Sequence, residues 1–360
     1  MKSPITSTRG WTERVLGEWL LLASASALVV TSVMLGRWPV VSVTEFEVVI
    51  LLWALFVAIK GLENGGLLLR LSHHIDKGRL IPLKLVAATF VLSAIVTNDV
   101  ALVVVVPVTL SLGIKKKGTL VVLEALAANA GSALTPFGNP QNLFIYWFYD
   151  VSLTDFVASI APLAFFLLAL LLIGTVFVRA DTGVKVRSDA AAIDPAVFLY
   201  GGFLIVVILT VLRVLPAAAG LLVLIYAAVF DRKALRVDNG LLVTFVCLAA
   251  LANNVGALLA TDLRHAGHTF LLAALSSQII GNVPATMLIA KFTTHWEALL
   301  WGVSVGGFGS LVASFANLIA YRLYVVEEGR NRRLAFTAQF MGVGFVMFLA
   351  GTALYFIRQV

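Results

Sequence analysis

Residues 93–110, SAIVTNDVALVVVVPVTL, decide the fold. Thr97, Asn98 and Asp99 interrupt a long apolar run there. A carboxylate in the middle of such a run costs about 2.5–3.5 kcal/mol to place in a bilayer, so its presence indicates a function. A second interrupted stretch, residues 277–286 (SQIIGNVPAT), repeats the pattern. We interpret the two stretches as mirror halves of one ion-handling site.

The composition is that of a helical membrane protein. Of 360 residues, 60% are hydrophobic and only 12% are charged, against about 25% charged in ordinary soluble domains. Apolar runs of membrane-spanning length recur along the chain. The net charge of +7 comes from Lys and Arg in short loops between these runs. This pattern is a topology signal, so we expect lipid as a partner and no nucleic acid.

Two further apolar runs are also interrupted. Residues 135–140 (TPFGNP) contain two prolines and a glycine, which a helix does not continue through. Residues 306–309 (GGFG) interrupt the run 296–326. Non-helical backbone inside a membrane is tolerated where it lines a cavity. The four interruptions predict new helices that begin at Val100, Gln141, Pro284 and Ser310.

The loop charges predict the organisation of the chain, because Lys and Arg concentrate on the cytoplasmic side. We predict an all-α, polytopic inverted repeat with two re-entrant hairpins and two broken transmembrane helices, a cytoplasmic N-terminus and an outside C-terminus. The first repeat is 1–178, with hairpin 83–112 and broken helix 118–149; a cytoplasmic linker is 179–195; an extra helix and the second repeat are 196–360, with hairpin 269–292 and broken helix 296–326.

Sequence echoes support two related halves. Asn98 matches Asn282, Gly131-Ser132 matches Gly309-Ser310, and Gln141-Asn142-Leu143 matches Ala316-Asn317-Leu318. Inverted repeats with interrupted segments at corresponding positions indicate the binding site of a secondary transporter.

The interruptions predict chemistry that suits ions. Helix N-termini attract anions, short amides donate to an oxyanion or accept from a cation, and freed carbonyls near Val96 and Ile280 suit a coupling cation. Asp99 either binds Na⁺, carries a proton, or merely caps a helix. The predicted substrate and ion residues are Thr97, Asn98, Asp99, Ser132, Thr135, Gly138, Asn139, Asn142, Asn282, Thr286, Ser310, Ser314 and Asn317.

Other polar residues in apolar runs have structural interpretations. Lys60 and Glu63 are spaced to neutralise each other on one helix face. Asn253 and Asn254 are interpreted as interhelical hydrogen-bonding groups. Glu124 lies near the predicted end of a helix, where we expect it to reach water. No resident metal or cofactor is predicted, apart from a Na⁺ near Asp99.

Three segments resemble the ion transporter superfamily: TNDVAL at 97–102, the string from Asn129 through GNPQNL at 138–143, and GNVP at 281–284. The chain is most similar to the YbiR-like anion transporters of that superfamily, which also includes arsenite exporters, Na⁺/H⁺ antiporters and citrate carriers. The resemblance implies paired hairpins, a substrate site between them, homodimers and elevator-type movement. It implies a site made by Asn98, Asp99, Asn142, Asn282 and Asn317. The paired Ser-Asn-Thr motifs of dicarboxylate symporters are absent, which argues against dicarboxylates and citrate.

Together these features predict a secondary active transporter of the inner, cytoplasmic membrane for a small inorganic or organic anion, coupled to H⁺ or Na⁺. The alternatives are a Na⁺/H⁺ antiporter, an arsenite-type exporter or, outside carriers, a passive channel. An enzyme is not expected, because the chain carries no nucleophile–base spacing, metal motif or nucleotide loop.

Overall fold

The computed structural model describes residues 19–66, 80–112, 114, 116–178, 194–259, 265–329 and 332–359. Within these residues the regular structure is helical, as the apolar runs predict. The basic residues of the loop 70–79 and most of the predicted linker 179–195 lie outside the described residues.

The helices of the first half are α2 (Trp19–Leu35), α3 (Val43–Asn64), α5 (Ile81–Ile95), α6 (Asn98–Ser111), α7 (Lys117–Ser132), α8 (Pro140–Phe148) and α9 (Leu153–Gly174). Those of the second half are α10 (Ala196–Val211), α11 (Gly220–Phe230), α12 (Asn239–Leu259), α13 (Ala266–Ile280), α14 (Asn282–Ala290), α15 (Trp296–Gly306), α16 (Phe315–Glu328) and α17 (Arg333–Gln359). Short 3₁₀ turns at Thr175–Phe177 and Ala217–Ala219 adjoin α9 and α11.

Helix length separates two kinds of helix. Among the described residues, three segments are long and apolar enough to cross a membrane: Leu153–Phe177, Asn239–Leu258 and Arg333–Arg358. The helices beside the interruptions are shorter; α5 has 15 residues and α14 has 9. At about 1.5 Å per residue, neither reaches across a hydrocarbon core of about 30 Å. Large apolar side chains on the outer surface, such as Val33 at 76% and Phe198 at 80% exposure, suit contact with lipid.

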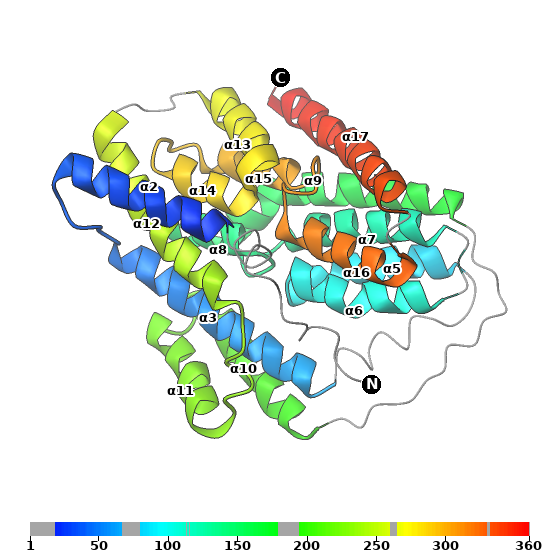
Figure 1. Cartoon of the computed structure of the whole chain (residues 1–360), viewed down its shortest axis with the longest axis horizontal. Coiled ribbons are helices and arrows are strands. Elements are labelled where there is room, and N and C mark those ends of the chain that lie inside the picture. The colour runs from blue at the N-terminus through cyan, green and yellow to red at the C-terminus, as the bar shows by residue number, and fades with distance from the viewer. Residues whose placement is uncertain are drawn as a thin grey trace.

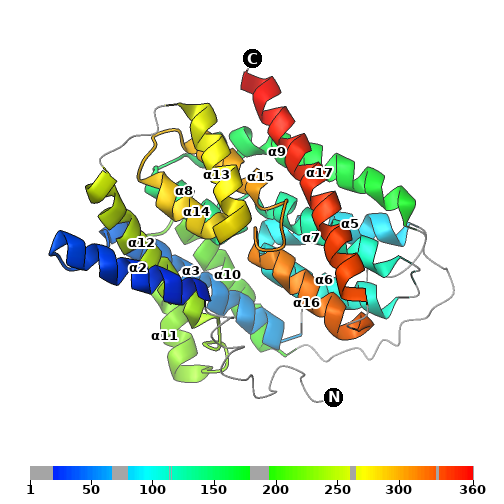
Figure 2. The same ribbon diagram turned by 45° about the horizontal axis from the view of Figure 1, so that its top comes forward.

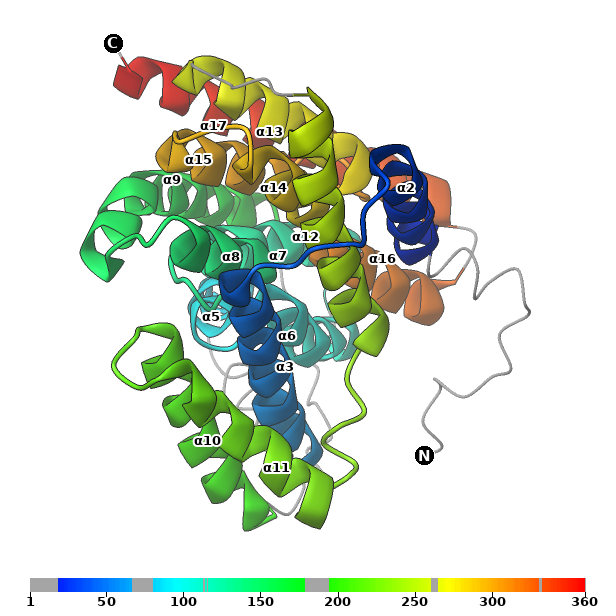
Figure 3. The same cartoon turned by 90° about the vertical axis from the view of Figure 1, so that its left-hand side faces the viewer.

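The helices form two groups. On one side, α2 packs against α12, and α10 and α11 pack against α3 (Figures 1 and 3). The other group contains α5–α9 from the first half and α13–α17 from the second. The hairpin and broken helix pack in the same way in the two halves. The hairpin helix α5 packs on α7 as α13 packs on α15, while α6 contacts α16 and α14 contacts α8. Figure 2 shows α16 lying along α6. Each hairpin, α5–α6 in the first half and α13–α14 in the second, therefore contacts the broken helix of the other half.

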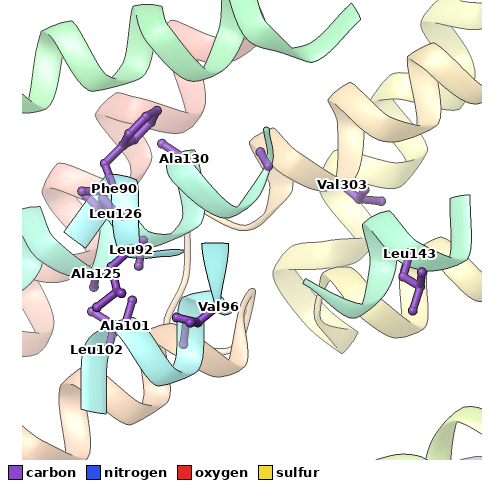
Figure 4. Close-up of a cluster of buried hydrophobic side chains, with 14 of the residues drawn as sticks. Phe90, Leu92, Val96, Ala101, Leu102, Ala125, Leu126, Ala130, Leu143 and Val303 are labelled. Atoms are coloured by element: carbon purple, nitrogen blue, oxygen red, sulfur yellow. The ribbon is translucent and has the colours of Figure 1, made fainter. Parts of the chain in front are cut away.

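Small residues allow the close approach of α5 to α7. Figure 4 shows Ala125, Leu126 and Ala130 of α7 near Phe90 of α5. A Cβ on Gly131 would lie 2.0 Å from the Phe90 carbonyl oxygen. In the second half, a Cβ on Gly306 would lie 2.5 Å from Cβ of Ser277 on α13. Glycine at both positions brings the helix backbones together, as small residues do in membrane helix pairs.

Three of the four helix starts were predicted within two residues, but the fourth was wrong. Helices α6, α8 and α14 begin at Asn98, Pro140 and Asn282, whereas α16 begins at Phe315 rather than Ser310. The reason is the Gln278 side chain. Its Oε1 accepts from the Ser310 N–H at 2.7 Å, and its Nε2 donates to the Gly306 carbonyl at 2.6 Å. These bonds stabilise a non-helical segment over residues 307–314.

Other structural interpretations have mixed outcomes. Lys60 and Glu63 form the expected ion pair at 2.9 Å. Asn254 is confirmed as a structural group, since its amide donates to Thr31 and Ser32 of α2. Glu124 does not reach water: its exposure is 0%, because α6 covers it and Thr109 donates to its Oε1.

Candidate functional site

The interruptions are built from matching hydrogen bonds in the two halves. Asn142 Nδ2 donates to the carbonyls of Ser132 and Thr135, ten and seven residues earlier. Asn317 Nδ2 donates to the carbonyls of Gly307 and Ser310, again ten and seven residues earlier. Each amide thus satisfies carbonyls that the end of the preceding helix leaves unpaired.

The contacts between hairpin and broken helix also match. The N–H of Asn98 donates to the Gly138 carbonyl at 3.3 Å, and the N–H of Asn282 donates to the Ala313 carbonyl at 2.9 Å. The hydroxyl of Thr135 donates to the Ala94 carbonyl at 2.8 Å. In the same way, the Ser310 hydroxyl donates to the Gln278 carbonyl at 2.9 Å.

These contacts correct one of the predicted correspondences between the two halves. The Asn98–Asn282 and Asn142–Asn317 correspondences agree with the hydrogen bonds. The match of Gly131-Ser132 to Gly309-Ser310 is wrong, because Gly131 packs as Gly306 does and Thr135 bonds as Ser310 does. The corrected pairs, Gly131 with Gly306 and Thr135 with Ser310, have the same separation of 175 residues as Asn142 and Asn317, whereas the predicted pair was 178 residues apart.

One buried residue joins the two halves. Asn129 of α7 accepts at Oδ1 from Asn98 Nδ2 at 3.1 Å and from Ser314 Oγ at 3.0 Å. Its Nδ2 donates to Asn317 Oδ1 at 2.7 Å and to the Gly307 carbonyl at 3.2 Å. The structure therefore brings together three predicted site residues, Asn98, Ser314 and Asn317. Asn129, which bonds to all three, is part of a motif quoted in the sequence analysis but was not predicted as a site residue. The only sequence signal for it was an amide side chain inside an apolar run.

The remaining predicted residues of the first half hold the backbone in place. The Asn139 side chain caps α8 by accepting from the Asn142 N–H, and its amide donates to Ser132 Oγ. A Cβ on Gly138 would lie 2.2 Å from the Ser132 carbonyl, so glycine is needed for this close approach. In the second half, Thr286 donates only to the Asn282 carbonyl within its own helix.

Asp99 does not cap a helix. Thr97 is the N-cap residue of α6 and makes no side-chain cap bond. Asp99 lies in the first turn, where its N–H donates to Asn98 Oδ1. Its Oδ1 is buried and has no hydrogen-bond partner among the described residues. An acid in the first turn complements the positive end of the helix dipole.

A cavity of about 340 Å³ lies beside the second hairpin. It is bounded by α2 and α12 of one helix group and by the α13–α14 junction and α16 of the other. The Asn282 side chain lines it, is only 6% exposed, and makes no hydrogen bond within the described residues. Arg322 also lines it and forms no ion pair among those residues. Arg322 falls within the broken helix predicted over residues 296–326, but the sequence analysis did not predict it as a site residue.

Two helix N-termini reach this cavity. Asn282 and Val283 are the first two residues of α14, and Phe315 is the first residue of α16; all three line the cavity. Neither helix has a side-chain cap bond. Gly281, which precedes α14, has φ +89°, a conformation that side-chain-bearing residues rarely adopt. At α14 the Asn282 N–H is already bonded to the Ala313 carbonyl and Pro284 has no N–H, so this terminus offers the Val283 N–H alone. Together with the start of α16, the Asn282 amide and the Arg322 guanidinium, it gives the cavity donors that bind anions.

Two other polar residues of the cavity are already engaged. Asp238 Oδ1 accepts from the Leu241 N–H at the start of α12. The Thr244 hydroxyl donates to the Gly240 carbonyl one turn earlier.

The fold and the site define a polytopic membrane protein of the transporter class. Comparison with known proteins identifies its family. The family model described as citrate transporter matches residues 12–306, and the chain belongs to this family. It is a transporter and not an enzyme.

Three relatives illustrate the similarity. An uncharacterized transporter of Methanocaldococcus jannaschii is 31% identical over 322 residues, covering 85% of this chain and 88% of the relative. The inner membrane protein YbiR of Escherichia coli is 34% identical over 309 residues, covering 79% and 81%. A silicon efflux transporter of Oryza sativa subsp. japonica is 34% identical over 120 residues, covering 31% and 24%.

Proposed function

We propose that this protein is a secondary active transporter that moves a small anion across the inner membrane and couples its movement to H⁺ or Na⁺. The cavity between the two helix groups carries this proposal. It combines two uncapped helix N-termini with the Asn282 amide and the Arg322 guanidinium. A site between two helix groups opens to either side of the membrane when one group moves against the other.

The charge of the cavity favours a small anion over citrate, although the family model carries the citrate name. Arg322 is its only cationic side chain within the described residues, and Asp238 lies at the same cavity. A tricarboxylate would bring up to three negative charges to this single guanidinium. A singly charged oxyanion is matched by one guanidinium and the helix dipoles.

The hydrogen bonds that recur in both halves support the inverted-repeat organisation. We infer two re-entrant hairpins, at α5–α6 and α13–α14, each lying against the broken helix of the other half. A cytoplasmic N-terminus, an outside C-terminus and a homodimer complete the proposal. The membrane location is supported by the inner-membrane relative.

A current measurement on purified protein in proteoliposomes tests the function. A solid-supported-membrane scan should include monovalent oxyanions, arsenite, silicate and citrate, each under H⁺ and Na⁺ gradients. We expect a substrate-dependent current with a small oxyanion that collapses when the coupling gradient is removed. Currents that persist without any coupling gradient and only follow the solute gradient would indicate a passive channel instead.

Asp99 favours a second function, cation–proton antiport, because its buried Oδ1 has no partner among the described residues. An unpartnered carboxylate oxygen is a ligand for Na⁺ or a site for a proton. In either function we expect Asp99→Asn to abolish coupling while the protein stays folded. Transport at the wild-type rate in liposomes carrying this variant would remove Asp99 from the mechanism. Na⁺/H⁺ exchange without any anion would establish the antiporter.

A further inference from the structure

Glu124 is a buried carboxyl group that the proposed site does not use. It lies in the middle of α7 with 0% exposure, five residues before the shared amide of Asn129. The Thr109 hydroxyl of α6 donates to its Oε1. Its Oε2 is buried and has no hydrogen-bond partner within the described residues. The carboxyl group therefore sits in the seam between the hairpin and the broken helix.

Within the part of the chain that the structure describes, no cation forms an ion pair or hydrogen bond with Glu124. Its neighbours along α7 and the facing part of α6 are buried apolar residues, namely Leu120, Val121, Leu123, Ala125, Val105, Val106 and Val108. The nearest cation on its own helix is Lys117, two turns away, which pairs with Glu328 of α16 and donates to the Leu110 carbonyl.

The other helices that contact α7 bring no compensating charge to Glu124. On α5 the one cation is Lys84, at the exposed end of the helix. The acid of α9 is Asp155 in its first turn. On α16, Arg322 lines the cavity beside the second hairpin, and Glu327 and Glu328 lie in the last turn. The charged side chains of α17 are at its ends, Arg333 and Arg358. Asp99 lies in the first turn of α6, at the opposite end of that helix from Thr109.

An ionised carboxylate in this position would have one neutral donor and no cation. Burying an unpaired charge is far more costly than burying a neutral group, and such groups neutralise instead. A bound Na⁺ requires several oxygen ligands, whereas Thr109 is the only side chain that forms a hydrogen bond with this carboxyl group in the described residues. The chemistry of the pocket therefore suits a proton.

We propose that Glu124 is a proton-binding site of this transporter, which holds a proton on Oε2 while α6 and α7 are packed together. This inference rests on the proposed function and names H⁺ as an ion that the chain couples to. The proton leaves Oε2 for water only when the α6–α7 seam opens, which leaves an ionised carboxylate behind. Proton release is thereby linked to a change in the packing of the hairpin against the broken helix.

The test reads the protonation of Glu124 directly and needs no substrate. Infrared difference spectra of purified protein, recorded while pH is raised in lipid nanodiscs, report the carbonyl stretch of protonated buried carboxylic acids. We expect a band that disappears at high pH in the wild type. It should be absent from Glu124→Gln and retained in Glu297→Gln, a matched control whose side chain is exposed at the start of α15.

A second variant covers the case in which Glu124→Gln does not fold. Thr109→Val removes the hydroxyl and keeps the shape of the side chain, so it should shift the frequency of the same band. Identical titrating bands in the wild type and Glu124→Gln, or no frequency shift in Thr109→Val, would overturn the proposal.

Proton flux into proteoliposomes, followed with an internal pH dye, distinguishes the two proposals. Proton movement driven by an anion gradient, lost in Glu124→Gln and restored in Glu124→Asp, supports both proposals. Anion-driven proton flux at the wild-type rate in Glu124→Gln would overturn the role of Glu124 and leave the transporter intact. A titrating Glu124 band without any anion-driven flux would refute the proposed anion function alone.

Discussion

Replacing Lys291 by methionine tests how the second hairpin is held to α3. Lys291 Nζ lies 2.7 Å from Glu45 Oε1, and the Glu45 side chain is only 1% exposed. Removing one partner of a buried ion pair costs about 3–5 kcal/mol, because the other charge is left uncompensated. We expect the lower end, about 3 kcal/mol, since Ser42 N and Asn253 Nδ2 still donate to Glu45 Oε2.

The reverse substitution, Glu45→Gln, should cost less. The Lys291 side chain is 18% exposed and can reach water, and its Nζ lies 4.5 Å from the centre of the Phe148 ring. We expect a loss of about 1.5–2 kcal/mol, at the lower end of the range for a hydrogen bond to a charged group. The double variant should be more stable than the sum of the single losses predicts, because neither charge is then left alone.

Equilibrium unfolding in mixed micelles containing SDS gives these free energies. Arg332→Gln is the control, since Arg332 pairs with Glu328 at 3.1 Å but is 64% exposed. Exposed pairs contribute about 0–1 kcal/mol. Equal losses for Lys291→Met and Arg332→Gln, or additive losses in the double variant, would refute the argument from burial.

Further substitutions test the central contacts. Asn129→Ala removes four hydrogen bonds, three of which join the two halves, and should cost more than about 3 kcal/mol, since each buried group left unpaired costs about 1–3 kcal/mol; the same unfolding assay measures it. Gly131→Ala should lose about 2–3 kcal/mol through overpacking, whereas Gly342→Ala, with open space at its Cβ, should change stability by less than about 1 kcal/mol. Arg322→Gln should raise the KM for the anion about tenfold, the equivalent of about 1.4 kcal/mol, with unfolding unchanged; Asn282→Ala should act in the same direction, and an unchanged KM in both would remove the cavity from the anion site.

The positions of three interruptions followed from local chemistry. Proline and glycine beside polar residues favour a helix end at two of these interruptions, so Pro140 and Asn282 begin helices near the predicted positions. The third interruption contains neither residue type, and the polar run Thr97-Asn98-Asp99 indicated the start of α6 at Asn98. The start of α16 depends instead on Gln278, which lies 32 residues before Ser310. Bonds between distant segments have no local signature, and this one holds Ser310 in the non-helical segment.

The site was predictable only in part for the same reason. Amides at interruptions indicated Asn98 and Asn317, but the residue that joins them, Asn129, looks in sequence like any interhelical amide. The depth of Glu124 depends on how α6 covers α7, which the apolar pattern of either helix alone does not reveal. Phe315, Leu318 and Arg322 lie on one face of α16 and line the cavity. The sequence alone did not show which face of this helix borders the cavity.

The organisation of the chain depends on helix ends that meet inside the membrane. Lys84 and Lys116, on either side of the α5–α6 pair, are both exposed and suit a labelling test. Single-cysteine variants Lys84→Cys and Lys116→Cys, made in a Cys247→Ser background, can be labelled in intact cells with a membrane-impermeant maleimide. We predict that both react only after the membrane is opened, because the pair returns to the cytoplasmic face. Reaction of one position from outside and the other only from inside would contradict the account, since α5–α6 would then be an ordinary crossing.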